Sequence, residues 1–236
     1  MNTPVTPPAS APAAPPAVTS TTSLISTLGL VSAICGLIIV GTYEATLAAA
    51  RANRQLAVER AVFKVLPTAK TVTEFLALPS GDILPGSGGD VPPGAVKFHA
   101  AYDTNGQLAG IAAEGAAKGY ADTVRVMFGY GSACQCIMGI GVVSMRETPG
   151  IGDKILTDKA FLQNFQALDV KLNAELSALA HEVKVVKHGS KTQPWQIDAI
   201  SGATVTSRAV GKGINDAAQA LLPRLVPKLD QLKGKP

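Results

Sequence analysis

Charge and hydrophobicity divide the chain near its N-terminus. Residues 1–22 carry no charged side chain and consist mostly of Pro, Ala, Ser and Thr, a composition typical of a disordered tail. Residues 23–42 also lack charge but are rich in Leu, Ile and Val. A helix of that length crosses the roughly 30 Å hydrocarbon layer of a bilayer. The pattern therefore predicts a disordered tail followed by a single transmembrane helix.

Apolar positions continue at helical spacing through residues 43–66, interrupted by charged side chains, and Pro67 follows. This pattern predicts a stalk helix that extends the membrane span and ends before the proline. Three arginines follow the span and no Lys or Arg precedes it: Arg51, Arg54 and Arg60. The positive-inside rule, applied alone, would place the rest of the chain in the cytoplasm.

The alternation of apolar and polar positions that is typical of strands begins after residues 79–94. This stretch is rich in Pro and Gly and predicts an exposed loop. The runs 95–103 and 107–114 flank Thr104-Asn105-Gly106, and Asn-Gly between two extended runs indicates a β-hairpin. Further strands are expected at 123–128, 134–145, 183–187 and 195–197. The run 134–145 is almost entirely apolar, which favours a central strand.

Helical spacing returns at 157–165, at 170–181 and in a last amphipathic helix that opens near residue 204 and should stop at Pro223. Strands, helices, strands and a closing helix in that order favour a mixed α+β domain over a regular α/β alternation. The predicted organisation is a tail at 1–22, a transmembrane helix at 23–42, a stalk at 43–66, one α+β domain at 67–223 and a basic tail at 224–236.

One turn joins the last predicted strand to the last helix: Asp198-Ala199-Ile200-Ser201-Gly202-Ala203-Thr204. The first amides of a helix lack internal acceptors, and the helix dipole favours a phosphate there. Gly202 and Ala203 keep the turn thin, so an anionic group could approach the backbone, and Thr204 offers a hydroxyl. The alternative is that the Ser and Thr residues are ordinary N-caps.

A second Gly-rich loop follows the apolar run: Glu147-Thr148-Pro149-Gly150-Ile151-Gly152. Its backbone could approach a flat ligand closely, and Glu147 and Thr148 could hydrogen-bond the polar edge of such a ligand. Without further context the segment is simply a turn.

The two motifs, in this order, resemble those of one flavoprotein family: the G subunit of the Rnf electron-transport complex and the C subunit of the sodium-translocating NADH:quinone reductase. The likeness covers roughly residues 23–222. It implies an FMN-binding domain in which a flavin transferase joins FMN to Thr204 by a phosphodiester. The other implied contacts to the cofactor are Ser201, Gly202, Ala203, Glu147, Thr148, Gly150, Ile151 and Gly152.

The resemblance also implies a function: an electron-transfer subunit of an Rnf-type ferredoxin:NAD+ oxidoreductase, a redox-driven translocase, working with other membrane subunits. It places the domain on the periplasmic side of a bacterial inner membrane, opposite to the charge rule, and we follow the resemblance there. Asp198 is expected to serve the attachment reaction. Two alternatives remain open: the C subunit of the quinone reductase, and a cofactor-free structural or assembly subunit.

Other chemistries find little support in the composition. The net charge of +4 comes from scattered Lys and Arg residues, and aromatic residues are few, which argues against a nucleic-acid partner. His99, His181 and His188 have no metal-ligand spacing, so no metal site is expected. Cys134 and Cys136 lie two apart in a predicted strand and are expected as two small buried side chains, with a disulfide or redox role left open.

Overall fold

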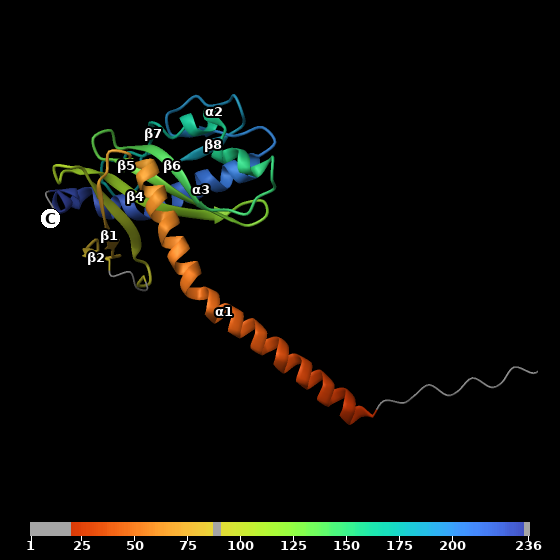
Figure 1. The fold of residues 1–236 in the computed structure, drawn as a ribbon. Helices are drawn as coiled ribbons and strands as arrows, with labels where there is room; N and C mark the ends of the chain where they lie inside the picture. Colours follow the sequence, from red (N-terminus) through yellow and green to blue (C-terminus); the bar gives the residue numbers. More distant parts are fainter. Residues whose placement is uncertain (1–19, 87–90, 234–236) are drawn as a thin grey trace, which may run out of the picture. The chain divides into compact units, whose positions relative to one another are not determined.

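The computed structural model describes residues 20–86 and 91–233, and it contains one long helix and a mixed α+β domain (Figure 1). The predicted fold class is therefore confirmed. The chain divides between Ala52 and Asn53 into two compact units. The tail predicted at residues 1–22 lies outside the described residues as far as residue 19, and α1 begins at Thr21.

Helix α1 spans Thr21–Val65 without interruption and covers both the predicted membrane span and the predicted stalk. At 1.5 Å per residue its 45 residues extend about 68 Å. Its N-terminal part is long and apolar enough to cross a membrane. The large apolar side chains there are exposed, as a helix that meets lipid requires. They include Leu24, Ile25, Leu28, Leu30, Val31, Ile34, Leu37, Ile38, Ile39 and Val40.

The second unit is built on a seven-stranded antiparallel sheet with the strand order β2-β1-β3-β4-β5-β6-β7. The strands are β1 Thr71–Ala77, β2 Ile83–Pro85, β3 Val96–Tyr102, β4 Leu108–Lys118, β5 Thr123–Gly131, β6 Cys136–Ser144 and β7 Leu168–Asp169. A separate parallel pair consists of β8 Lys184–Val186 and β9 Gln196–Asp198. The remaining helices are η1 Gly152–Leu156, α2 Lys159–Gln163, α3 Thr204–Leu225 and η2 Val226–Leu232.

The hairpin predicted around Asn-Gly is confirmed as β3 and β4. Gly106 adopts a φ of 71°, a region that favours glycine. The carboxylate of Asp103 accepts hydrogen bonds from the amides of Asn105 and Gln107 at 2.8 and 2.9 Å. Local sequence chemistry therefore determines this turn.

The sheet begins earlier than predicted, because β1 and β2 precede or lie within the expected loop at 79–94. The β1 segment has two polar threonines at alternate positions and was not recognised as a strand. Its core contribution is concentrated in Phe75, whose ring stacks on Phe98 at 5.7 Å, and in the buried Ala77. A tertiary contact therefore supports this strand more than its own pattern does.

The helix predicted at 170–181 is wrong. The amides of Ser177 and Ala178 donate to the side-chain oxygen of Asn173, Leu176 has a φ of 54°, and Leu172 pairs with Leu179 across an isolated bridge. An Asn side chain that binds nearby backbone amides stabilises a turn at the expense of a helix.

The predicted strand at 134–145 begins only at Cys136, and it is not central: β4 is in the middle of the sheet, and β6 pairs with the two-residue β7 on its outer side. The chain turns at residues 132–135, so Cys134 lies in an exposed turn. Gln135, with a φ of 51°, directs the chain so that Cys134 and Cys136 form a disulfide. The expectation of two small buried side chains is therefore wrong for Cys134, and the disulfide that the sequence left open is present.

Helix α3 does not stop at Pro223 but runs to Leu225, and η2 follows within the segment predicted as a basic tail. Leu225 and Leu232 are both buried in the main core. Burial of these apolar side chains offsets the hydrogen bond that a proline inside a helix removes.

Hydrophobic clusters cover both faces of the sheet. The larger cluster lies between the sheet and α3, and includes Phe98, Phe128, Tyr130, Val210 and Ile214. The smaller cluster joins the C-terminal end of α1 to the opposite face, and includes Ala61, Val62, Val65, Ala112 and Met127. The N-terminus of α3 thus rests on the larger core.

Candidate functional site

The turn between β9 and α3 contains the first motif. Gly202 has a φ of 82°, and a Cβ at this position would meet nothing within 4 Å, so the backbone is open to solvent there. Ala203 occupies the N-cap position of α3, and no side chain caps the helix. The reading of Ser201 and Thr204 as ordinary N-caps is therefore wrong. The first amides of a 22-residue helix meet no capping side chain beside the partly exposed Thr204.

Ser207 fixes the shape of this turn from within. Its buried hydroxyl donates to the carbonyl of Ala203 at 2.9 Å and accepts from the amide of Ile200 at 3.1 Å. The amide of Ala203 also donates to the carbonyl of Ile200 at 3.1 Å. Ser201 and Gly202 remain exposed on the outside of the turn.

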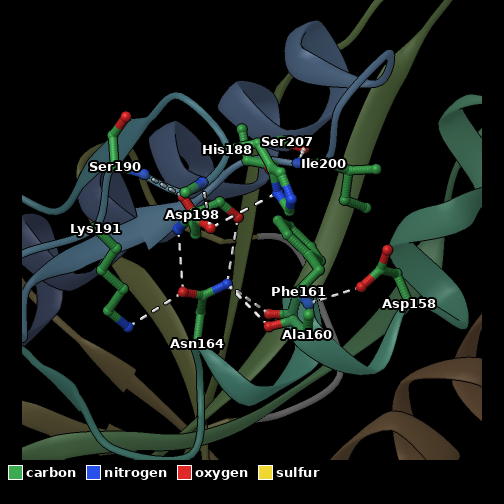
Figure 2. A network of polar contacts seen from close by, with 12 residues as sticks. Asp158, Ala160, Phe161, Asn164, His188, Ser190, Lys191, Asp198, Ile200 and Ser207 are labelled. Atoms are coloured by element: carbon green, nitrogen blue, oxygen red, sulfur yellow. Dashed lines mark hydrogen bonds and ion pairs between the residues drawn. The ribbon is translucent and has the colours of Figure 1, made fainter.

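Asp198 begins the motif and holds the loop that follows β8. Its carboxylate accepts from the amides of Gly189 and Ser190 at 2.8 and 3.2 Å (Figure 2). The Nδ1 atom of His188 lies 3.0 Å from the carbonyl oxygen of Ala199 and 3.7 Å from the Asp198 carboxylate. Because a carbonyl oxygen can only accept, Nδ1 is the donor of the shorter contact. Asp198 therefore shapes the backbone next to the turn.

Asn164 anchors the other side of Asp198, and sequence reasoning did not identify it. Its side chain, 6% exposed, donates to the Asp198 carbonyl at 3.3 Å and accepts from the Asp198 amide at 3.0 Å (Figure 2). The same amide nitrogen donates to the Phe161 carbonyl, and the oxygen also accepts from the Lys191 ammonium at 3.1 Å. Burial lowers the pKa of Lys191, and the charge of Asp198 partly opposes that shift.

Glu147, from the second motif, ties three elements together. Its Oε2 accepts from the Thr206 hydroxyl at 2.8 Å and from the Tyr120 amide at 3.3 Å, and its Oε1 accepts from the Ala121 amide at 3.2 Å. The carboxylate thereby links the β4–β5 turn to the first turn of α3. The sequence predicts Glu147 at the polar edge of a ligand, but protein groups donate hydrogen bonds to both of its oxygens.

Glycine lets the second loop approach this carboxylate. A Cβ at Gly152 would lie 2.7 Å from the Cβ of Glu147 and 3.0 Å from the Thr206 hydroxyl. The carbonyl of Thr148 accepts from the amides of Ile151 and Gly152 at 3.2 and 3.0 Å. Gly150, with a φ of 76°, and the side chain of Thr148 are exposed. The structure therefore brings the second motif to the first turn of α3, which directly follows the first motif, although Glu147 and Thr206 lie 59 positions apart.

Three apolar side chains next to these contacts remain exposed: Tyr120 at 72%, Ile151 at 47% and Val205 at 48%. Tyr120 binds Glu147 through its amide, Ile151 precedes Gly152, and Val205 precedes Thr206. Exposed apolar groups gathered around a polar centre are typical of a surface that receives a flat, partly apolar ligand.

A cavity of about 280 Å³ opens beside the turn. Its lining includes Ser201 but not Thr204, and comprises Lys154, Asp158, Ala160, Phe161, His188, Asp198, Ala199, Ile200 and Ser201. The cationic side chain of Lys154 is suited to an anionic group. In the described part of the chain no three His, Cys, Asp or Glu side chains gather as a metal site.

Comparison with known proteins supports the family indicated by the two motifs. Residues 119–219 match the FMN-binding domain, and this range contains both motifs. The chain is 34% identical to the G subunit of the Na(+)-translocating ferredoxin:NAD(+) oxidoreductase complex of Acetobacterium woodii, over 49% of this chain and 51% of that protein. It is 26% identical to the G subunit of the ion-translocating oxidoreductase complex of Methanosarcina acetivorans, over 83% of this chain and 92% of that protein.

The match to the Acetobacterium protein thus spans only about half of that protein's length. Two solved structures share the fold. NqrC of Shewanella oneidensis superposes with a TM-score of 0.57 at 19% identity, over 76% of this chain and 97% of that one. The C subunit of the Na(+)-translocating NADH-quinone reductase of Parabacteroides distasonis superposes with a TM-score of 0.51 at 22% identity, over 71% of this chain and 80% of that one. The resemblance that the two motifs predicted is confirmed.

Proposed function

We propose that this chain is a membrane-anchored electron-transfer subunit of an Rnf-type ion-translocating oxidoreductase and that it carries FMN on Thr204 through a phosphodiester. The observation that carries the proposal is the contact of the second motif with the uncapped first turn of α3, where the first motif ends. Thr204 presents its hydroxyl where the helix dipole and free amides favour a phosphate. Bound FMN would supply the electron-accepting and electron-donating group.

The protein groups around Thr204 have separate roles in this proposal. Gly202, with its positive φ, leaves the backbone uncovered for the phosphate. Ser201, which is exposed on the same turn, would offer the phosphate a hydroxyl. Tyr120, Ile151 and Val205 offer apolar surface to an isoalloxazine ring, and the Thr148 hydroxyl offers it a polar contact. Glu147 acts indirectly, because it fixes the loop and the helix to each other.

The proposal assigns maturation to a flavin transferase, which must read the exposed turn. Asp198 contributes by holding the neighbouring backbone through the amides of Gly189 and Ser190. Other membrane subunits of the complex are the electron-transfer partners. Within the described part of α1 no acidic side chain lies among residues 21–43, so ion movement is assigned to those subunits.

We place the domain on the periplasmic side of a bacterial inner membrane. One of the arginines that argue for the opposite side, Arg54, lies 3.7 Å from Glu114 and so pairs with the domain. Protease treatment of intact spheroplasts tests this placement, and complete protection of the domain would refute it.

The cofactor is tested by expressing the full-length chain with a flavin transferase and viewing a boiled, denaturing gel under ultraviolet light. The wild type is expected to fluoresce, and Thr204→Ala should lose the signal completely. Ser201→Ala, which removes another exposed hydroxyl of the same turn, is the matched control and should retain it. Mass spectrometry should find the FMN adduct on the peptide that contains Thr204.

Each outcome separates the candidates. Fluorescence retained in Thr204→Ala would move the attachment to another residue. An unmodified wild-type peptide would favour the cofactor-free structural or assembly role. Membership of the complex is tested separately, by identifying the membrane proteins that co-purify with the tagged chain. Recovery of quinone-reductase components in place of Rnf-type components would favour the quinone-reductase alternative.

A further inference from the structure

The Cys134–Cys136 disulfide lies in the turn between β5 and β6, in the second unit of the chain. The two sulfurs differ in environment: Cys134 is exposed, whereas Cys136 is only 7% exposed and begins β6. The sequence carries no charged residue between Arg125 and Arg146, but Asp169 of β7 pairs with Cys136 in the sheet and lies 3.9 Å from the Lys171 ammonium. An attacking group would therefore meet the exposed Cys134 beside a partly exposed ion pair.

The bond adds little to the fold. It closes a loop with one intervening residue, and the stabilisation from loop closure grows with loop length. The β5–β6 ladder already pairs Gly131 with Cys136 and Tyr130 with Ile137. The ladder thus already holds Cys136 in place, and it joins the two strands on either side of the turn without the disulfide. A structural role does not explain its presence.

The local backbone also favours opening of the bond. Gln135, between the two cysteines, has a φ of 51°, a region that non-glycine residues rarely adopt. Gly131 makes room for this sulfur beside the strand, because a Cβ there would lie 3.1 Å from the Cys134 sulfur and 2.8 Å from the sulfur of Met138. Exposed disulfides in constrained surroundings are the ones that exchange readily with thiols.

We propose that Cys134–Cys136 is a thiol–disulfide exchange site that accepts two electrons from a dithiol, with the Cys134 sulfur as the attacked atom. A thiolate of the donor bonds to the Cys134 sulfur, the Cys134–Cys136 bond breaks, and Cys136 leaves as a thiolate that takes up a proton. The second donor thiol then displaces Cys134 as a thiol. The chain gains two electrons and two protons, and the donor becomes a disulfide. This site is independent of the flavin.

The reaction is tested on the full-length chain in detergent, in a Cys35→Ala background that removes the remaining thiol. The protein is equilibrated in glutathione buffers of increasing reduced fraction, quenched with acid and labelled with a maleimide mass tag. Without denaturant, both cysteines are expected to take up the tag together. Half of the chains should be reduced at a glutathione ratio that lies within the series of buffers. A pair that stays untagged even in excess dithiothreitol until the chain is unfolded would overturn the proposal.

Single variants identify the attacked sulfur. In Cys136→Ser the remaining Cys134 thiol should react with oxidised glutathione at least tenfold faster than the Cys136 thiol does in Cys134→Ser. Equal or reversed rates would overturn the assignment. The double Ser variant is the stability control, and its thermal midpoint should lie within about 3 °C of the wild type. A larger fall would show that the disulfide is a structural staple instead.

Discussion

The two faces of the central sheet are built from different chemistry. The face toward α3 is dry and contains large aromatic and aliphatic side chains, such as Phe98, Phe128 and Ile214. The opposite face holds the small cluster at the end of α1, and around it lie charged side chains of β1, β3, β4 and β5. These charged residues are Glu74, Lys97, Glu114 and Arg125, with Arg54 joining from α1.

The difference shows where the fold can support a precise site. The turn of Thr204 starts the helix that packs on the dry face, so its position is determined by a close-packed core. The charged face instead contains a cavity of about 340 Å³ lined partly by Arg54 and Arg125, and ion pairs open to water constrain geometry weakly. We expect substitutions on the two faces to differ accordingly in their effects on stability and on flavin attachment.

The largest expected effect is at the contact between α3 and β4. A Cβ at Gly115 would collide with the backbone of Gly213, which has no flexible side chain to move away. Gly115→Ala should lower the free energy of unfolding by about 2–3 kcal/mol and reduce flavin incorporation. Urea unfolding of the full-length chain in detergent, followed by the fluorescence of Trp195, measures the change.

The matched control on the opposite face is Gly139→Ala. A Cβ there would lie 3.8 Å from the Cα of Val65, an ordinary contact distance. Its expected effect is within about 0.5 kcal/mol of the wild type. Equal losses in both variants would show that the two faces are packed equally tightly.

The next effect concerns the buried polar anchor. Asn164→Leu removes the side-chain partner of the Asp198 amide and carbonyl, whereas the ammonium of the exposed Lys191 can turn to water. Unsatisfied buried groups cost about 1–3 kcal/mol, so a loss of about 2 kcal/mol is expected in the same urea assay. Gln166→Leu, an exposed amide two residues later, should change stability by less than about 0.5 kcal/mol.

A smaller effect is expected for the ion pair of the charged face. Arg125 and Glu114 lie 2.8 Å apart, and both are partly exposed. Arg125→Met should lower the free energy of unfolding by less than about 1 kcal/mol. The difference from the wild type should shrink as salt is added, because salt screens exposed charges. A loss that stays constant between low and high salt would contradict an electrostatic origin.

The smallest effect is a pH dependence from His99, also on the charged face. Burial lowers the pKa of His99 below its ordinary value of 6.5, Lys97 adds to the shift, and Glu74 and Glu114 oppose it. The unfolded chain therefore binds the proton more tightly, and this contribution to stability is lost as the pH falls from 6.5 through the folded pKa. His99→Gln should accordingly be more stable relative to the wild type at pH 5.5 than at pH 7.5, as thermal unfolding at both values would show.

Local patterns predicted the parts of the fold that local chemistry determines. The Asn105-Gly106 hairpin, the start of α3 at Thr204 and the long first helix followed from turn residues and from apolar spacing. The strand β1 was missed because its support comes from Phe98 on another strand. The false helix at 170–181 had helical spacing, but the side chain of Asn173 binds the backbone in a turn.

The candidate site followed the same division. The residues of the two motifs, 147–152 and 198–204, were each predicted from their own segment. The structure places the first of these segments against the helix that follows the second. Asn164 and Ser207 were not predicted, because each acts through backbone groups of residues that sequence spacing does not connect to it. The role of Glu147 also could not be read from its loop, since its partners belong to the β4–β5 turn and α3.

If FMN is attached as we propose, the buried hydroxyl of Ser207 closes the turn of Thr204 before the transferase arrives. A substrate segment that already has its final shape loses little conformational freedom when it is bound. The rate of maturation should therefore depend on how often the enzyme and the folded chain meet, and should rise in proportion to enzyme concentration. An unfolded peptide of the same sequence should be a far poorer substrate.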